Sequence, residues 1–385
     1  MKNIKFSKQK IKILILNLSV LFPLILNNST LSQIIIISFF CITAVFYGDF
    51  SLTISKLIFL MLILFSIVFN ITQIEFKNAM RLLQITLGFM VFPLAINVST
   101  LNIKFIRFGI IYVTIFAILD IFNVPLFFAF REIVYPIEFD AWGAGFDRTI
   151  ITITNRYGSI FYNPNLLGQS MLLIYILYLV TVYQRKFTKA DVFFLSCNIF
   201  CILVSGSRTA FVVFGIITFC YFMQFYRNRI KYLLIFALIP LLLYVLSGTR
   251  LLDISNTSGG SMDQKSQILF AYLGTLSYDD TLVVLFGSLR QDIQFDNDLG
   301  NIIYYIGFLG LIYIAFFYLY ETLTASGKTR YFYSFLMVSY GATLLINFKF
   351  FIFTMIILSA LRSLTKALKA SRRHLEHPEN KLTVT

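Results

Sequence analysis

The sequence predicts an all-α membrane protein, a polytopic bundle of about twelve spanning helices with both termini in the cytoplasm. Of the 385 residues, 58% are hydrophobic and 13% are charged, whereas about a quarter of the residues in a soluble domain are charged. The apolar runs lack the strict alternation of a membrane β-barrel. In lipid, such a run satisfies its backbone hydrogen bonds only as a helix.

The first expected helix, 11–27, follows four lysines and has a fifth, Lys12, at its start, so it could be mistaken for a secretory signal peptide. Residues 27–30 are Asn, Asn, Ser and Thr rather than a small-residue cleavage site, so we expect this helix to be retained. The later apolar runs predict spans at 31–47, 54–71, 82–99, 106–126, 165–183, 190–205, 209–226, 231–247, 299–320, 331–347 and 350–362.

The charges between these spans set the expected orientation. With the N-terminus inside, the cytoplasmic side receives 22 of the 32 basic residues but only 5 of the 18 acidic residues. Cytoplasmic loops of membrane proteins carry an excess of Lys and Arg, so we expect both termini inside. The same rule explains the net charge of +14 without a nucleic-acid partner, because no basic soluble segment with spaced aromatic residues is present.

We therefore expect one membrane domain, 1–362, followed by a basic cytoplasmic tail, 363–385. Two external loops, 131–163 and 248–298, are much longer than the other external connections. Long polar loops on a compact bundle are usually functional or disordered.

No metal or cofactor is expected. The two histidines, His374 and His377, lie in the tail, and the sequence has no Walker, GxGxxG, HExxH or CxxC motif. Cys197 and Cys201 are spaced like half of a metal site, but no His or carboxylate stands beside them, which favours packing inside the bundle.

The segment that starts the span at 165–183 has the sequence of a helix N-terminus. Asn163 suits the N-cap, Pro164 the first helical position, and Gly168 a close approach of a second helix. Free N–H groups at such an end, beside Asn165, could also receive an anion. A helix cap without further function is the alternative.

Residues 205–210, Ser-Gly-Ser-Arg-Thr-Ala, lie between two apolar runs at the expected outer surface. Arg208 has no acidic neighbour in the sequence, and a cation at the membrane edge is costly unless it is paired or functional. Its guanidinium matches phosphate oxygens, although an arginine that only snorkels to the interface is the alternative.

Residues 290–298, Arg-Gln-Asp-Ile-Gln-Phe-Asp-Asn-Asp, end the second long loop and lead into a helix. Acidic residues there also suit the first turn of a helix. Three weaker candidates stand elsewhere. Asp120 lies within an expected span, where a carboxylate is a functional candidate by default, and Arg148 and Arg156 lie in the first long loop.

Together and in this order, these segments resemble the O-antigen polymerase and O-antigen ligase superfamily of bacterial inner membranes. The resemblance covers 155–320 most clearly, and the N-terminal helices fit by hydropathy alone. The family has an Asn-Pro-Asn stretch, a Ser-Arg-Thr/Gly-Ala stretch two helices later, a large external loop, an acidic or His-Asn stretch and a Gly-x-x-Gly helix. The matching residues here are 163–165, 207–210, 296–298 and 307–310.

In the ligase branch, the residue eleven positions before the first glycine of that last helix is a histidine. Here the first glycine is Gly307, and that position is Asp296. The resemblance therefore favours a polymerase over an O-antigen ligase. A lipid-linked oligosaccharide flippase, also a protein of many spanning helices, is the second alternative, but it needs a polar cavity through the bundle rather than large external loops.

The resemblance implies a metal-independent glycosyltransferase at the outer face of the inner membrane. It would transfer the growing glycan from undecaprenyl diphosphate to a sugar hydroxyl of a new lipid-linked repeat unit. Family analogy adds a separate chain-length regulator as a partner. Arginines would neutralise the diphosphate leaving group, and a carboxylate would act as general base.

The resemblance assigns these roles to particular candidate residues. The expected catalytic residues are Asp296 as base, with Arg208 and Arg290 at the diphosphate. Asp120 is a more remote candidate for the base. The expected substrate-binding residues are Arg156, Arg148, Asn163, Asn165, Asp292 and Asp298, of which Asp292 and Asp298 are also alternative bases.

Overall fold

The structure is a computed structural model that describes residues 8–26, 30–71, 74–134, 157–161, 164–183, 185, 187–225, 267, 270–274, 281–288, 298–340 and 348–376. Throughout these ranges the elements are helices, and β-pairing is limited to an isolated bridge between Gly48 and Leu94. The all-α prediction is confirmed for this part of the chain.

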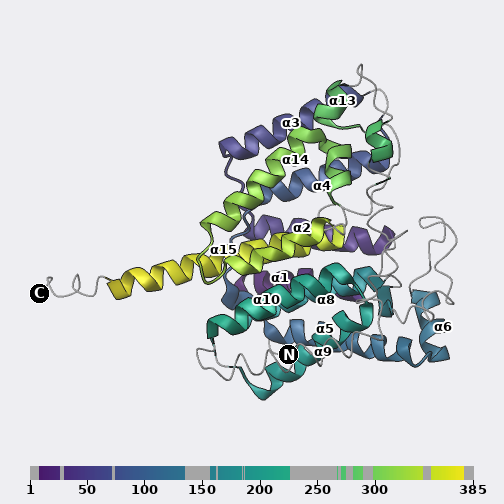
Figure 1. Cartoon of the computed structure of the whole chain (residues 1–385), viewed down its shortest axis with the longest axis vertical. Helices are drawn as coiled ribbons and strands as arrows, with labels where there is room; N and C mark the ends of the chain where they lie inside the picture. The colour runs from purple at the N-terminus through teal and green to yellow at the C-terminus, as the bar shows by residue number, and fades with distance from the viewer. Residues whose placement is uncertain are drawn as a thin grey trace, which may run out of the picture.

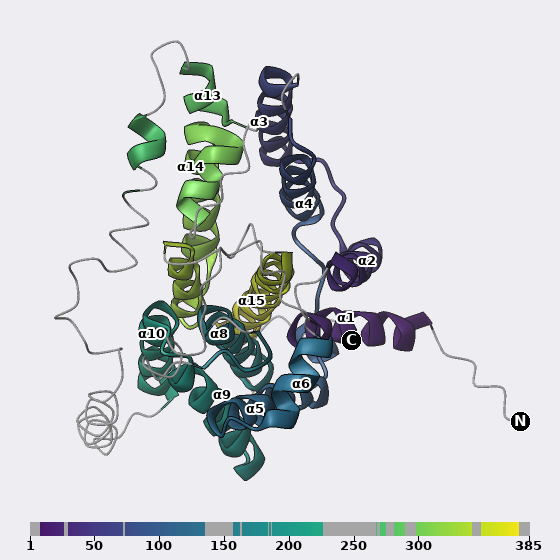
Figure 2. The same cartoon turned by 90° about the vertical axis from the view of Figure 1, so that its right-hand side faces the viewer.

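Two groups of helices lie on opposite sides of a middle layer (Figure 2). One group consists of α3 (Ile54–Asn70), α4 (Phe76–Val91), α13 (Thr281–Phe286) and α14 (Asp298–Thr324). The other consists of α5 (Ile103–Ile121), α8 (Pro164–Val182), α9 (Lys189–Ser205) and α10 (Arg208–Phe225). The middle layer contains α1 (Lys8–Ile25), α2 (Thr30–Tyr47) and α15 (Phe348–Glu376).

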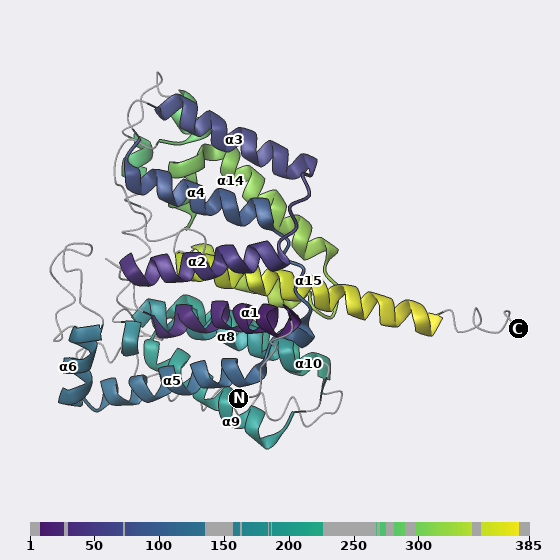
Figure 3. The ribbon, with the colours of Figure 1, turned by 180° about the vertical axis from the view of Figure 1, so that it is seen from behind.

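The long helices run side by side, so the bundle has two ends (Figures 1 and 3). We call one the α6 end, after the short helix α6 (Pro125–Val134), which lies there with α13 and with the starts of α8, α10 and α14. The opposite end is the tail end, from which the C-terminal part of α15 projects (Figure 1).

Ten of the twelve expected spans coincide with α-helices, although some boundaries differ. Helix α4 starts six residues before the expected span at 82–99, and α15 continues through Glu376 into the expected tail. The expected span at 231–247 lies outside the described residues. Part of the span at 331–347 is instead a 3₁₀-helix, η5 (Arg330–Tyr340). Its three-residue repeat brings the fully buried rings of Phe332 and Phe335 onto one face.

Three described helical segments are long and apolar enough to cross a membrane: Pro164–Val182, Asp298–Thr324 and Phe350–Ser371. Shorter apolar helices cover Ile34–Tyr47, Ile54–Asn70 and Arg208–Tyr221. Large apolar side chains are also exposed along the outside of the bundle, for example Val45 at 71% and Phe316 at 66%. A soluble monomer rarely exposes apolar surface on this scale, so these helices indicate a membrane protein.

Helix α8 is the most enclosed helix of the described bundle. Sixteen of its residues are buried, among them a continuous run from Leu167 to Val180. Helices α5, α9, α10 and α15 all pack against it. Because α8 is apolar around its whole circumference, this enclosure is what its sequence requires.

Helix α14 is bent sharply at Gly307, whose φ of 70° and ψ of −173° are not helical. The bend removes the normal partners of the carbonyl oxygens one turn earlier. The Tyr304 oxygen accepts a hydrogen bond from the Ser288 backbone N–H at 2.6 Å, and the Tyr305 oxygen accepts one from the Ser66 hydroxyl at 2.9 Å. Every buried carbonyl needs such a partner, so α3 and α13 hold the bend in place.

The tail end is held by buried carboxylates. Asp191, with no exposed side-chain surface, accepts hydrogen bonds from Arg107 at 2.8 Å and from Arg185 at 2.7 and 2.8 Å. The Tyr178 hydroxyl adds a third donor side chain at 2.6 Å. On the other side of the bundle, Arg362 of α15 forms a two-pronged pair with the fully buried Glu321 of α14, a geometry that guanidinium and carboxylate groups favour.

We predict that Gly307→Ala destabilises the fold. The backbone conformation of Gly307 is one that essentially only glycine adopts and costs another residue about 1–3 kcal/mol, and a Cβ here would overlap the backbone of Leu285 and Phe286 in α13. Thermal unfolding of the purified protein in detergent measures the effect. Gly215→Ala is the matched control, since a Cβ at Gly215 meets no atom within 4 Å. Equal melting temperatures for the two variants would contradict the structural role of the bend.

Candidate functional site

Four of the expected site residues lie in the described part of the chain, and all four are at the α6 end. They are Asp120 near the end of α5, Asn165 in the first turn of α8, Arg208 at the start of α10 and Asp298 at the start of α14. The other expected residues lie outside the described ranges, namely Arg148, Arg156, Asn163, Arg290, Asp292 and Asp296.

The structure brings the first two sequence motifs into contact. Gly168, one turn into α8, lies against the connection between α9 and α10. A Cβ added to Gly168 would lie 2.6 Å from Ser205 Oγ, 2.7 Å from Ser207 Cβ and 3.3 Å from Ala210 Cβ. Only glycine permits this approach, so the expected close helix contact at Gly168 is confirmed.

The connection between α9 and α10 is a tight turn with an internal set of hydrogen bonds. Gly206 adopts the left-handed conformation, with φ of 58°, that ends many helices. Its N–H donates to the Leu203 carbonyl at 3.0 Å, and the Ser205 hydroxyl accepts from the Ser207 N–H at 3.2 Å. The buried turn therefore fixes the start of α10, where the Arg208 side chain is exposed.

Asp120 anchors the segment that leads towards α8. Its Oδ2 accepts hydrogen bonds from the backbone N–H groups of Gly158 at 3.1 Å and Ser159 at 2.9 Å. The Ser159 hydroxyl donates to the Val113 carbonyl at 3.1 Å, and the Tyr157 N–H donates to the Val204 carbonyl at 3.2 Å. The segment 157–161, which includes η3 (Ser159–Phe161), is thus held on α5 and α9 beside the α9–α10 turn.

The third motif contributes a buried carboxylate. Asp298, in the first turn of α14, has no exposed surface, and Asn301 one turn later is 1% exposed. Because α14 bends at Gly307, the limb that carries Asp298 lies within electrostatic range of the Tyr318 hydroxyl on the second limb. Tyr318 is partly buried, and its hydroxyl oxygen, which is itself buried, has no hydrogen-bond partner within the described ranges.

A polar network surrounds this bent limb. Arg81 of α4 donates to the Tyr305 hydroxyl at 2.6 Å, and that hydroxyl donates to Asn78 Oδ1 at 3.3 Å. From α3, the Asn70 amide donates to the Gly287 carbonyl at 3.1 Å. Asn70 and Asn78 are at most 1% exposed, so these amides lie in the interior of the helix group.

Sequence reasoning missed Arg81 and its partners. The expected span at 82–99 left Arg81 in an external connection, whereas α4 starts at Phe76 and includes Asn78, Arg81 and Gln84. Polar residues three apart on an otherwise apolar helix were the available signal, because that spacing places them on one face.

The site therefore consists of two clusters at the α6 end, one in each helix group. We call them the turn cluster (Asn165, Gly168, Ser205, Ser207 and Arg208) and the bend cluster (Asn78, Arg81, Asp298, Asn301 and Tyr305). Helix α15 lies between the two groups (Figure 2). The turn cluster contains one charged side chain, Arg208, whereas the bend cluster contains two of opposite charge, Arg81 and Asp298.

Within the described ranges, no three His, Cys, Asp or Glu side chains come close enough to hold a metal ion. The two clusters are built from guanidinium, amide, hydroxyl and carboxylate groups.

Comparison with known proteins gives no relative from which a role could be transferred, since no protein-family model and no curated protein matches the chain.

We predict that Asp120→Ala releases the segment 157–161. The variant loses two hydrogen bonds to a buried carboxylate, and a bond to a charged group contributes about 1.5–3 kcal/mol. Amide hydrogen exchange at Gly158 and Ser159 should therefore be faster by about tenfold or more. In Asp120→Asn, which keeps one acceptor oxygen, the exchange rate should lie between those of the wild type and Asp120→Ala. Unchanged exchange in Asp120→Ala would show that other contacts hold the segment.

Proposed function

We propose that this chain is a bacterial surface-polysaccharide polymerase, of the O-antigen or capsule type, in the inner membrane. It transfers the growing glycan from undecaprenyl diphosphate to a new lipid-linked repeat unit. The contact between Gly168 and the α9–α10 turn carries the proposal. That contact packs the helix that begins at the Asn-Pro-Asn motif of the family resemblance against the turn that contains the Ser-Arg-Thr-Ala motif.

The proposal includes a topology of about twelve spans with the α6 end outside and the tail end in the cytoplasm. The distribution of charge supports it. Basic residues gather at the tail end, among them Arg107, Arg185, Arg362 and Lys366, whereas Arg81 and Arg208 are at the α6 end. This asymmetry agrees with the excess of Lys and Arg on the cytoplasmic side of membrane proteins.

In the proposed reaction, the bond between the anomeric carbon and the diphosphate oxygen breaks as the acceptor hydroxyl attacks. Negative charge then develops on the leaving diphosphate. The exposed guanidinium of Arg208 lies at the end of the bundle where a lipid diphosphate would be at the membrane surface. Arg290 remains the second proposed diphosphate contact, and Arg156 and Arg148 remain proposed substrate-binding residues.

The acceptor hydroxyl loses its proton in the same step, and a carboxylate is the available base. Asp296 remains our first candidate, and Asp292 is an alternative. Asp298 is fully buried, which suits a residue that positions the start of α14 better than one that meets a sugar. Asp120 is already bound to two backbone N–H groups, and we assign it the anchoring role described above.

A ligase and a flippase are the alternative functions. Deletion of a polymerase, a ligase or a flippase would each make a different product accumulate. Loss of a polymerase leaves single repeat units on the lipid A core. Loss of a ligase leaves long chains on the lipid carrier, and loss of a flippase leaves repeat units on the cytoplasmic face. Analysis of surface polysaccharide and of lipid-linked intermediates therefore separates the three functions.

We predict that Arg208→Ala leaves the protein inserted but stops chain growth. Loss of one donor to a developing negative charge reduces a rate by about 10²–10³-fold, so polysaccharide ladders should be replaced by single capped units. Arg208→Lys should retain part of the activity, because the charge remains while the planar fork is lost.

Arg330→Ala is the matched control, since Arg330 is also exposed but follows α14 at the tail end. It should give normal ladders. Normal ladders in Arg208→Ala, at an equal amount of membrane protein, would remove Arg208 from the mechanism.

We predict that Asp296→Ala and Asp296→Asn both stop chain growth, because neither side chain accepts a proton, whereas Asp296→Glu restores part of it. General-base catalysis contributes about 10²–10⁴-fold, which the ladder assay resolves. Asp49→Asn, in the connection after α2, should have no effect. Full activity of Asp296→Asn would assign the base to another residue.

A further inference from the structure

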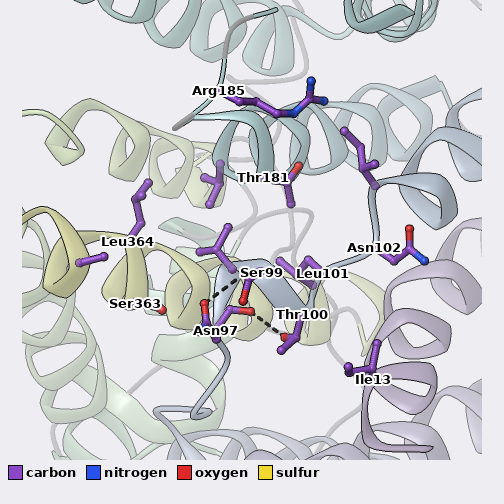
Figure 4. A pocket seen from close by; sticks show the side chains of 14 residues that line it. Ile13, Asn97, Ser99, Thr100, Leu101, Asn102, Thr181, Arg185, Ser363 and Leu364 are labelled. Carbon is purple, nitrogen blue, oxygen red and sulfur yellow. Dashed lines mark hydrogen bonds between the residues drawn. The ribbon is translucent and has the colours of Figure 1, made fainter. Parts of the chain in front are cut away.

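A separate cavity of about 590 Å³ opens at the tail end, away from both clusters of the candidate site. Its walls come from α1, from η1 (Val98–Thr100) and the start of α5, from the end of α8 and from α15 (Figure 4). Cavities of this size hold small organic ligands. The polymerisation chemistry proposed above makes no use of it, because that chemistry lies at the opposite end.

One wall of the cavity is rich in hydrogen-bond donors. In the segment before α5, the Asn97 side-chain oxygen accepts from the Ser99 N–H at 3.1 Å, and the Thr100 hydroxyl donates to the Asn97 carbonyl at 2.6 Å (Figure 4). Asn102 Oδ1 likewise accepts a hydrogen bond from the Lys104 N–H at 3.0 Å. Because the oxygens of Asn97 and Asn102 serve these turns, their NH₂ groups are left to donate to a ligand.

The charge of the cavity is positive. Arg185 lines it, and the lining contains no acidic residue. Arg185 has five N–H donors, and two of them donate to Asp191. Arg107 binds the same carboxylate, so two cations face one anion beside the cavity. Lys104 and Lys366 are exposed, and each is adjacent in the sequence to a residue that lines the cavity.

The rest of the lining is apolar and includes Ile13, Leu101, Val180 and Leu364. A free phosphate ion would use the donors but not this apolar surface. A phospholipid would use both, with its phosphate at the donors and the start of its acyl chains on the apolar wall. Polar and basic pockets between helices at the cytoplasmic side are suited to anionic lipid headgroups.

We propose that this cavity binds the phosphate group of an anionic phospholipid from the cytoplasmic leaflet. The site goes beyond the polymerase function and rests only on the topology proposed above, in which the tail end faces the cytoplasm. The Asn97 side-chain amide and the Ser99 and Ser363 hydroxyl groups, which Figure 4 shows on one side of the cavity, contact the phosphate, and Arg185 on another wall contributes positive charge.

Lipid binding to the purified full-length protein in a neutral detergent tests the site without any measurement of polysaccharide. Three probes are added separately: short-chain phosphatidylglycerol, short-chain phosphatidylcholine and inorganic phosphate. Protection against thermal unfolding, followed over a concentration series, gives the apparent affinity of each probe. We expect saturable protection by phosphatidylglycerol.

Ser363→Glu places a carboxylate in the cavity wall and should weaken phosphatidylglycerol binding by about tenfold or more, since like charges at contact distance repel. Ser371→Glu is the matched control, because Ser371 is exposed two turns further along the same helix and is not part of the lining. It should bind as the wild type does. Ser99→Glu, on an exposed position of η1, repeats the test if Ser363→Glu fails to fold.

Protection by phosphatidylglycerol that Ser363→Glu or Ser99→Glu weakens supports the lipid site. Protection by inorganic phosphate alone, with the same loss in the variants, supports the phosphate donors but assigns a soluble ligand. Equal protection by phosphatidylcholine, or equal binding in wild type and both cavity variants, would overturn the proposal.

Discussion

A helix that is apolar around its whole circumference is stable only when other helices cover it, and α8 imposes this condition on the fold. Its buried residues extend almost without a break from Leu167 to Val180. Neighbouring helices can cover α8 closely only where their backbones approach its backbone. At the α6 end, Gly168 makes this possible, because it has no side chain to separate α8 from the α9–α10 turn. The position of Arg208 follows from this packing, because the turn fixes the residue that starts α10.

The second constraint is the need of every buried backbone carbonyl for a donor. The bend at Gly307 frees the carbonyls of Tyr304 and Tyr305, which accept hydrogen bonds from the Ser288 N–H just after α13 and from the Ser66 hydroxyl of α3. The bend thereby ties α3, α13 and α14 into one unit. It also turns the limb that carries Asp298 into the interior, where Asp298 has no exposed surface.

The described arginines have different surroundings at the two ends of the bundle. At the tail end, buried Asp191 and Glu321 each hold arginine from another helix, so the carboxylates join helices that are distant in the sequence. Removal of one partner from such a buried pair leaves an uncompensated charge. At the α6 end, Arg208 is exposed and Arg81 binds a neutral tyrosine hydroxyl.

The sequence by itself determined the helical class, most of the helix positions and the existence of the motifs at 163–168, 205–210 and 296–310. These depend on local properties, namely apolar run length, helix capping and the conformational freedom of glycine. The tertiary structure alone decided which motifs meet. It joined Gly168 to the α9–α10 turn, gave Asp120 an anchoring role and buried Asp298, and it brought Arg81 to Tyr305 across 224 positions of the chain. Contacts between residues so far apart depend on how helices pack around α8 and on which carbonyls the bend at Gly307 leaves to be satisfied, and neither is encoded in any local pattern.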